Sequence, residues 1–384
     1  MRAVVSVSLL LVACGTPPWA RGADEPLDAP PPEPEPRIVQ VTRSPWKSTT
    51  ADELPCGEAD AALEHVARRI AERRARGAGP PDADVVSSWM RASGEPHVRP
   101  RVVTATGKAP IADETVQGRL EALRTPHARC GVARAPLPHG GEEIVAVVVD
   151  ALADLAPLPM RARTGQWLTF EATLRAAAEG ATLVVLGPRG VPRTVPTSLD
   201  RTSGTVRARF AVERPGAYTV QLVGDLAHGG PRPLLEARVF ADVEPPSDDE
   251  GPAPVPGEDA SADLGSLVDA LRSAESLPPL TRDARLDAVA TAHAERMRAA
   301  GSIAHDLGEG DLRARFAEAS LEARVVGENV ARGPTVLHAH RALYASPSHR
   351  LNLLRADYTH VGVGLARADD GTVYACEVFA GGLR

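Results

Sequence analysis

Two histidines and a glutamate have the residue types most able to do chemistry in this chain. His305, Glu328 and His349 stand in three separate short motifs near its C-terminal end. Imidazole and carboxylate groups can together coordinate a divalent cation such as Zn²⁺, or act as a general acid and base in hydrolysis. The sequence has no H-E-x-x-H or G-x-S-x-G motif, and no cysteine stands beside these histidines. Spacing alone therefore establishes neither activity.

The sequence around the two histidines predicts how each is held. Ser346 is a good N-cap residue and Pro347 suits the first position of a helix, so His349 falls in the first helical turn. The positive end of a helix disfavours imidazolium, which predicts a neutral ring. A longer helix is predicted from Thr281 to Gly301, and His305 follows its C-terminal end.

Other polar residues of this segment receive structural interpretations. His293 lies on the apolar stripe of the predicted helix and is interpreted as a core histidine. His338 and His340 stand two positions apart on a helix and are predicted to be surface residues, because such a pair cannot share one face. Cys376 lies in a strand-like run and is expected to be a small buried hydrophobe.

The motifs of residues 264–384 occur in the order of a known family. The stretches "LVDALRSAESLPPLTRDARLDAVATAHAERM", "IAHD", "GENVARG", "SPSHRLNLL" and "YTHVGVGLA" follow one another. This order resembles the CAP superfamily of cysteine-rich secretory, antigen 5 and pathogenesis-related proteins, and especially its bacterial SCP-like branch. The resemblance implies a three-layer α-β-α sandwich whose cleft carries two histidines and one or two acids. His305, Glu328 and His349 match those positions.

The sequence also departs from the family pattern. The second glutamate of animal and plant members falls at Ser346, and the tryptophan common before "SPxH" is replaced by Leu343 or Tyr344. The resemblance therefore does not supply a complete set of acids.

The N-terminus has the features of an export signal. Arg2 precedes an apolar run, Ala3 to Ala13, that is too short to span a bilayer as a helix. The run ends in "LVAC", which resembles a bacterial lipobox and predicts cleavage before Cys14, lipidation of that cysteine and an outer-membrane anchor. Residues 1–22 would then be a lipoprotein signal peptide and the start of a tether. The alternative is an ordinary signal peptide cut near Ala20.

The net charge of −7 arises from two predicted linkers. Residues 23–36 and 243–263 contain 12 acidic residues and no basic one, so the rest of the chain carries about +5. We interpret residues 23–51 and 244–263 as acidic, proline-rich linkers. The remainder shows no basic patch typical of nucleic-acid binding, and aromatic residues make up only 3% of the chain.

Residues 157–243 read as strands. "WLTFEATL" and "TVRARFAV" alternate apolar and polar residues, and turn signals such as "GPRG" separate the runs. Several short strands at this spacing predict an immunoglobulin-like β-sandwich with no convergent polar set.

Residues 52–156 repeat features of the C-terminal segment. "DAALEHVARRIAERRARG" has the apolar period of "DARLDAVATAHAERMRAAG", and a glycine-led hairpin follows in each case. This pattern predicts an α/β domain that is a degenerate CAP-like copy without site residues. Coincidence between two amphipathic helices and two hairpins is the alternative. Cys56 and Cys130 lie in this segment, where an exported location permits a disulfide bond between them.

The predicted architecture is α+β, with a CAP-like domain at residues 264–384, and three functions are open. The first is a lipid-anchored, exported protein with a non-enzymatic cleft for a lipid, cation or protein ligand, displayed at the periplasmic face or the cell surface. The second is a metal-assisted hydrolase that uses His305, Glu328 and His349. The third is a structural scaffold in which these residues bond only to one another. A non-enzymatic protein is favoured, with Zn²⁺ or another divalent cation as the expected cofactor if a metal binds.

Overall fold

The computed structural model describes residues 39–40, 53–79, 81, 83–111, 113–137, 140–227, 229–245 and 263–384. The predicted signal peptide, Cys14, most of the linker at 23–51 and nearly all of that at 244–263 lie outside the described residues. One short strand, β1 (Val39–Gln40), falls within the first predicted linker and pairs with β8 (Leu158–Pro159). None of the helices described in the structure combines the length and apolar character needed to cross a membrane.

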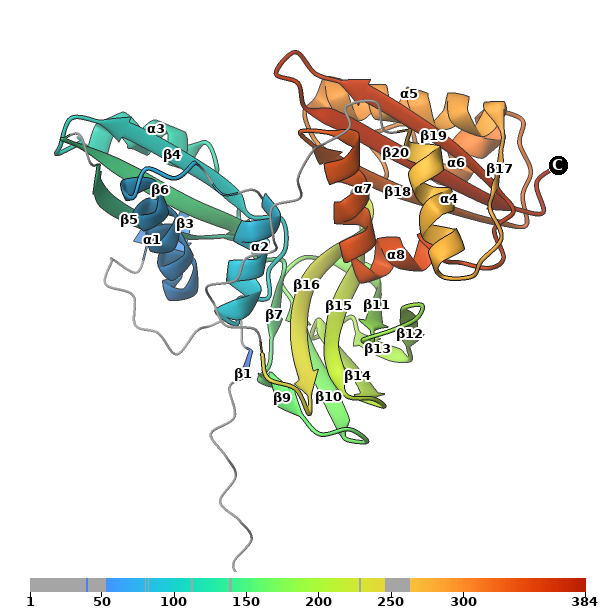
Figure 1. The fold of residues 1–384 in the computed structure, drawn as a ribbon, viewed down its shortest axis with the longest axis horizontal. Helices are drawn as coiled ribbons and strands as arrows, with labels where there is room; N and C mark the ends of the chain where they lie inside the picture. The colour runs from blue at the N-terminus through green and yellow to red at the C-terminus, as the bar shows by residue number, and fades with distance from the viewer. Residues whose placement is uncertain are drawn as a thin grey trace, which may run out of the picture. The chain divides into compact units, whose positions relative to one another are not determined.

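The C-terminal segment is built around a four-stranded sheet (Figure 1). Its strand order is β17 (Thr281–Arg282), β19 (His360–Arg367), β20 (Val373–Gly381) and β18 (Val325–Gly333). β19 and β20 form the predicted antiparallel hairpin around the "ADDG" turn. β17 runs parallel to β19, and β18 is the other edge strand.

Helices cover both faces of this sheet (Figure 1). Successive residues of a strand point to opposite faces, so β20 is buried on both sides. Its Tyr374, Cys376 and Val378 pack with α5 (Ala284–Ala300) and α6 (Leu312–Glu318). Residues between them pack with the other layer, which comprises α4 (Leu264–Ala274), α7 (Val336–Ala345) and α8 (Pro347–Leu353).

Helix α5 begins two residues later than predicted. Thr281 belongs to β17, and the N-cap is Asp283, whose carboxylate accepts hydrogen bonds from the amides of Arg285 and Leu286. A carboxylate at this position also interacts favourably with the positive end of the helix. The predicted end at Gly301 is confirmed, because this residue adopts the left-handed conformation typical of a helix C-terminus.

The N-terminal segment has the same strand order around its own sheet. β3 (Gly57–Ala59) runs parallel to β5 (Ala128–Leu137), which pairs in turn with β6 (Gly141–Asp150) and β4 (Arg101–Gly107) in the order β3-β5-β6-β4. The directions match those of β17-β19-β20-β18, and β2 (Glu53–Leu54) adds one further edge strand. The helices of this segment are α1 (Ala61–Ala75), α2 (Ala83–Ala92) and α3 (Asp113–Glu121).

A disulfide bond ties β5 to the start of this domain. Cys56 and Cys130 are bonded, with their Cα atoms 6.0 Å apart. Both side chains are fully buried, and the amide of Asp60 donates to the carbonyl of Cys130 at 2.9 Å. The bond therefore fixes the chain immediately before α1, whose N-cap is Asp60.

In both domains the backbone of the first long helix packs directly against a glycine of the sheet. A Cβ atom on Gly131 would lie 1.9 Å from the backbone nitrogen of Glu64 in α1. A Cβ atom on Gly364 would lie 2.2 Å from backbone atoms of Ala290 and Thr291 in α5. Such distances are far below van der Waals contact, so only glycine permits this packing.

We expect Gly131→Ala and Gly364→Ala each to destabilise its own domain by at least about 2 kcal/mol, because the added methyl group meets helix backbone that cannot rotate away. Hydrogen exchange resolved by peptide should show faster exchange in α1 for the first variant and in α5 for the second. Gly118→Ala is the control, since a Cβ atom there meets nothing within 4 Å. Exchange in α1 or α5 equal to that of the control would contradict the close packing.

The strands between the two domains form two sheets around one apolar core. Their orders are β13-β14-β10-β7 and β12-β11-β15-β16-β9. Phe170, Phe210 and Leu222 are fully buried between the sheets, which confirms the inward face predicted for residues 168–174 and 206–212. The first sheet begins before residue 157, because β7 pairs with β10. The strands are β7 (Ala153–Leu155), β9 (Arg161–Ala162), β10 (Trp167–Leu174), β11 (Ala178–Leu186), β12 (Arg193–Val195), β13 (Thr197–Asp200), β14 (Thr205–Ala211), β15 (Gly216–Leu226) and β16 (Gly230–Ala241).

Candidate functional site

The edge strand β18 places two adjacent polar residues on opposite faces of the C-terminal sheet. Glu328 pairs with Val378 of β20 and faces the α5–α6 layer, whereas Asn329 pairs with Glu377 and faces the α7–α8 layer. Each residue is buried and joins a different polar network.

Glu328 lies at the centre of the first network. His305 Nδ1 is 2.8 Å from its Oε1, and Arg315 Nη2 donates to the same oxygen at 2.9 Å. Arg315 Nη1 lies 2.7 Å from Oε2, so the guanidinium faces both carboxylate oxygens. Burial raises the pKa of Glu328, but the hydrogen bonds and charges of His305 and Arg315 outweigh it and lower the pKa to about 2. Glu328 is thus a charged acceptor near neutral pH and not a general acid or base there.

A second buried histidine, His293 of α5, bonds to a second carboxylate, that of Glu309. His293 is fully buried, which confirms its interpretation as a core histidine. Its Nδ1 lies 2.6 Å from Oε1 of Glu309, and its Nε2 lies 2.9 Å from the carbonyl oxygen of Ala304. Both ring nitrogens therefore have partners, and the ring helps to hold the loop that carries His305.

His349 lies in the first turn of α8, as predicted, but its partner is not Glu328. Ser346 occupies the N-cap position without making a side-chain cap. Its Oγ instead lies 2.8 Å from His349 Nδ1 and accepts a hydrogen bond from Gln221 Nε2 at 3.0 Å. If the hydroxyl donates to His349 Nδ1, the neutral ring carries its proton on Nε2.

Three effects keep His349 neutral. Burial is the largest, followed by the charges of His305 and Arg99, and together they lower the pKa of His349 to about 3. The lowered pKa agrees with the neutral ring predicted from the helix position, but its largest cause is burial and not the helix terminus.

A further polar network lies on the other face of the sheet. Asn329 donates from Nδ2 to Glu377 Oε2 at 3.0 Å and to the carbonyl oxygen of His349 at 3.1 Å. His340 is buried, and its Nδ1 lies 3.7 Å from Glu377 Oε1. The prediction of His340 as a surface residue is wrong, because His340 lies on the buried face of α7 with Val336, Ala339 and Leu343.

The predicted metal ligands do not meet as a coordination sphere. His305 and Glu328 are in contact. The guanidinium of Arg315, however, lies against the carboxylate of Glu328, in the place that a metal ion would take. His349 is bonded to Ser346 instead. Within the described ranges, no group of three or more His, Cys, Asp or Glu side chains could hold a metal ion.

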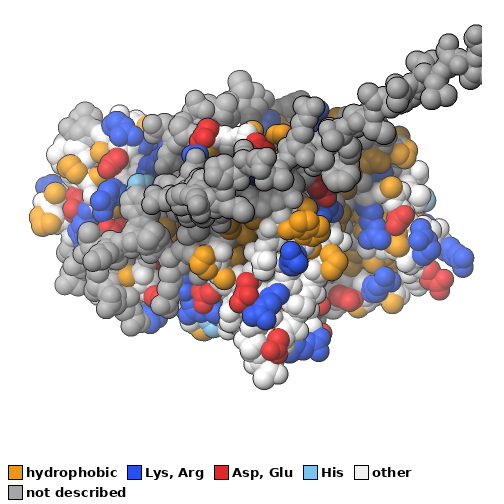
Figure 2. Space-filling view, turned by 90° about the horizontal axis from the view of Figure 1, so that it is seen from below, with side chains coloured by type: hydrophobic (Ala, Val, Ile, Leu, Met, Phe, Trp, Pro, Cys, Tyr) orange, Lys and Arg blue, Asp and Glu red, His pale blue; other side chains and the backbone are white. Residues whose placement is uncertain are grey.

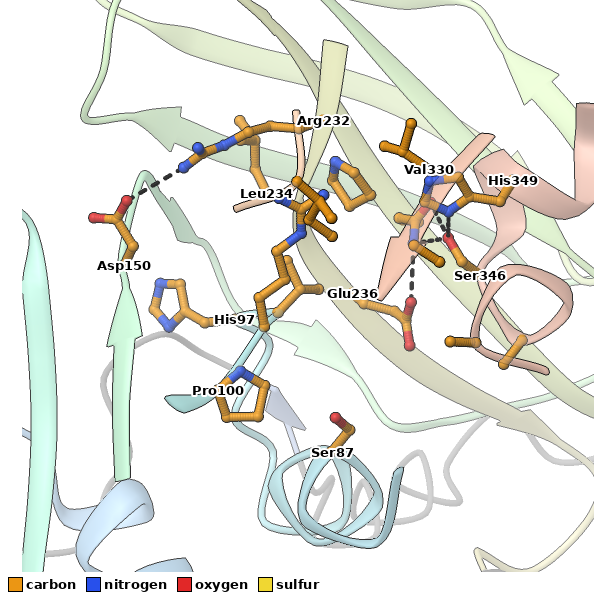
Figure 3. A pocket seen from close by; sticks show the side chains of 18 of the residues that line it. Ser87, His97, Pro100, Asp150, Arg232, Leu234, Glu236, Val330, Ser346 and His349 are labelled. Carbon is orange, nitrogen blue, oxygen red and sulfur yellow. Dashed lines mark hydrogen bonds and ion pairs between the residues drawn. The ribbon is translucent and has the colours of Figure 1, made fainter. Parts of the chain in front are cut away.

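A cavity of about 520 Å³ opens beside His349 (Figure 3). Its walls come from residues 87–101 and 125–152, from β15 and β16, and from the C-terminal domain. Ser346 and His349 lie across this space from His97 and Asp150 (Figure 3). His305 and Glu328 do not line the cavity, so among the three predicted site residues only His349 faces it.

Sequence reasoning missed Arg315 and Gln221, which bond to the predicted residues. Arg315 lies on a short helix with charged neighbours, and its sequence looks like that of a solvated face. Gln221 comes from a strand of the β-sandwich, far from His349 in the sequence. The one local signal for the burial of Arg315 is that the apolar Phe316, itself buried, follows it directly. No local signal indicates that Gln221 contacts Ser346.

The low pKa of His349 predicts a dependence of stability on pH. An unfolded histidine binds its proton near its ordinary pKa of 6.5, whereas the folded one does so only near 3. The contribution is therefore complete above pH 6.5 and is lost as the pH falls toward 3, by at most about 1.4 kcal/mol per pH unit. We expect His349→Gln to show a shallower fall in unfolding free energy between pH 6.5 and 5 than wild type, in urea titrations followed by hydrogen exchange.

The control for this experiment is His360→Gln, a histidine of β19 outside the cavity. Glu328 adds a second loss, because its lowered pKa gives stability that is present above pH 4.5 and lost as the pH falls toward 2. Both variants retain that loss. Parallel pH profiles for wild type and His349→Gln would contradict the neutral state assigned to His349.

Comparison with known proteins identifies the C-terminal segment. The model of the cysteine-rich secretory protein family, CAP, matches residues 266–379. No curated protein matches the chain.

Solved structures with similarity to the chain come from several organisms. An outer surface protein of Borrelia burgdorferi is 24% identical, with 31% of this chain and 89% of that chain covered and a TM-score of 0.29. An extracellular protein containing an SCP domain from Bacillus anthracis is 16% identical, with 60% and 86% covered and a TM-score of 0.29. A cysteine-rich secretory protein from Staphylococcus aureus is 13% identical, with 60% and 83% covered and a TM-score of 0.27. The family match agrees with the motifs and with the helix–sheet–helix layers, and the chain therefore contains a domain of the CAP superfamily at residues 266–379.

Proposed function

We propose that this protein is an exported, lipid-anchored CAP-domain protein that binds a small ligand in the cavity beside His349, without catalysing a reaction. The cavity carries this proposal, because its volume of about 520 Å³ lies in the range typical of small-molecule sites. Apolar side chains and a few polar groups share its walls, which is the usual composition of such sites. The apolar lining residues include Val98, Leu152, Leu234, Ile303, Val330 and Leu343.

The polar groups near the cavity favour binding over hydrolysis. A general base needs a pKa near the working pH, and Glu328 has a pKa of about 2 while His349 has one of about 3. The carboxylate of Glu328 is also held by Arg315 on both oxygens. The neutral His349 is suited to donate one hydrogen bond to a ligand.

A cavity-filling variant tests ligand binding. We expect Ala342→Trp to abolish binding of a neutral, environment-sensitive dye such as prodan, because Ala342 lines the cavity and is exposed there. Ala292→Trp makes the same change on an exposed position of α5 outside the cavity and should leave dye binding unchanged. Equal dye binding by both variants, or no saturable binding by wild type, would exclude the cavity as the site.

Export and lipidation are supported by separate features. The apolar run before Cys14 and the "LVAC" motif favour a lipoprotein signal. The bond between Cys56 and Cys130 suits an oxidising compartment outside the cytosol. Metabolic labelling of cells with an alkyne fatty acid should mark the wild-type protein and Cys376→Ser but not Cys14→Ser. Labelling of Cys14→Ser would rule out the anchor.

We also propose that residues 52–156 are a degenerate copy of the CAP domain and that the strands between the domains form an immunoglobulin-like spacer. The shared strand order, the parallel first strand, the Asp N-cap of α1 and α5, and the glycine under each helix support the first idea. The copy has no "GEN" or "SPxHR" motif. Its role would then be to complete the cavity, to which it contributes His97 and Arg99.

A further inference from the structure

Positive charge is in excess on the walls of the cavity. Five arginines line it, together with only two carboxylates, Asp150 and Glu236. Both carboxylates are already paired: Asp150 lies 3.2 Å from an arginine and Glu236 lies 2.9 Å from another. Figure 3 shows the ion pair between Asp150 and Arg232 among the residues that line the space. The five arginines are Arg91, Arg99, Arg101, Arg232 and Arg332.

The excess is concentrated around Arg99. Loss of hydration, followed by the charges of Arg232 and Arg332, lowers the pKa of Arg99 to about 10. Among the residues that the structure describes, no carboxylate lies within ion-pair distance of Arg99 or Arg332, although Arg332 Nη1 donates to the carbonyl oxygen of Gly301 at 3.1 Å. Arg99 is an exposed residue and lines the cavity, so a ligand can reach its side chain.

The backbone at Arg99 is also strained. Its φ is +59°, a conformation that residues other than glycine seldom adopt, and Pro100 follows it directly. Strain of this kind persists only where the surrounding structure enforces it, and it is concentrated at functional sites. Here it fixes Arg99 in a cavity wall that Arg232 and Arg332 also line, and the like charges of these side chains oppose one another.

One outer face can be compared with the cavity. On the face drawn in Figure 2, the acidic and basic side chains that are visible are interspersed over the surface. The cavity therefore concentrates one sign of charge next to apolar walls, which is the arrangement that a ligand with an anionic head and an apolar body requires.

We propose that the cavity binds a phosphate group through Arg99, Arg232 and Arg332, with the apolar body of a phosphate monoester against Leu234, Val330 and Leu343. This rests on the proposed function, since it names the ligand class of the same cavity. Arginine suits the role because its planar donors match phosphate oxygens, and a dianion would offset much of the excess charge. His349 Nε2–H is a further donor facing the same space. Two of the three arginines come from outside the CAP domain.

Calorimetric titration of the full chain with three probes tests this proposal. The probes are octyl phosphate, octanol and inorganic phosphate. We expect octyl phosphate to bind at least ~10-fold more tightly than octanol, and Arg99→Gln to weaken octyl phosphate ~10- to 100-fold without changing octanol. Arg214→Gln is the matched control, because Arg214 is also exposed and also precedes a proline.

The outcomes separate the inference from the proposed function. If inorganic phosphate binds as tightly as octyl phosphate, and Arg99→Gln weakens the binding of both, the site is for free phosphate. If octyl phosphate binds more tightly than inorganic phosphate, the ligand has a phosphate head group on an apolar body. Equal affinities for octanol and octyl phosphate, or an Arg99→Gln affinity equal to that of Arg214→Gln, overturn the phosphate site while ligand binding stands. If no probe binds and the dye experiment also fails, both proposals are overturned.

Discussion

Arg315→Ala is expected to lower the free energy of unfolding of the C-terminal domain by about 3–5 kcal/mol. The substitution leaves Glu328 buried, with His305 Nδ1 and the Cys376 thiol as its remaining side-chain hydrogen-bond partners. A buried carboxylate that loses its main partner keeps the cost of desolvation without the compensating charge. Cys376 provides the probe, because it is the free, buried cysteine of this domain and its thiol reacts only after the domain opens. Its labelling in urea, followed by mass spectrometry of its peptide, measures the change.

Two further variants make the result specific to the ion pair. Arg313→Ala removes an exposed arginine of the same helix and should change the unfolding free energy by no more than about 0.5 kcal/mol. Arg315→Ala combined with Glu328→Gln should recover part of the loss, because the buried charge is then absent. The effect of Arg315→Ala alone should also shrink as the pH falls and Glu328 becomes protonated. Equal losses in Arg313→Ala and Arg315→Ala would show that the pair contributes nothing.

Local patterns predicted the fold of the C-terminal domain well. The period of the helix that ends at Gly301 and the alternation of the β19–β20 hairpin depend on neighbours in the sequence, which is what periodicity reports. The start of the helix was misplaced because threonine and aspartate are both good caps, and β17 uses Thr281 for strand pairing.

The site was only partly predictable, because its decisive contacts are between distant segments. The family motifs identified His305 and Glu328, which do meet. They could not indicate that Arg315 would neutralise Glu328, or that Gln221, 125 residues before Ser346, would bond to it. Burial of a charged side chain depends on the tertiary fold and leaves no periodic trace in the sequence.

The cavity illustrates the same limit more strongly. Arg99 follows a histidine and a valine in a segment with no helix or strand pattern, and its sequence neighbours give no reason to place it beside His349. Only the meeting of three separate segments creates the excess of positive charge. Net charge calculated along the chain was therefore uninformative, since the acidic linkers dominate it.

The disulfide bond is expected to have the second large effect, now on the N-terminal domain. Cys56→Ala combined with Cys130→Ala should lower its unfolding free energy by about 4 kcal/mol. The two cysteines are 74 residues apart, and closing a loop of this length in the unfolded chain costs roughly that much entropy. The bond also fixes the residues that lead into α1, so that the helix start and β3 should be affected first.

Peptide-resolved hydrogen exchange in α1, β3 and β5 measures this change, and a reductant supplies an independent control. Reduced wild type should match the double variant, and the double variant should not respond to the reductant. Cys376→Ala removes a thiol that forms no disulfide, in the other domain, and should leave exchange in α1 unchanged. If the reductant leaves wild type unaffected, the bond does not support the domain. If the effect is found, the N-terminal domain depends on oxidation to keep Arg99 in the cavity wall, and a chain made in a reducing compartment should bind octyl phosphate more weakly.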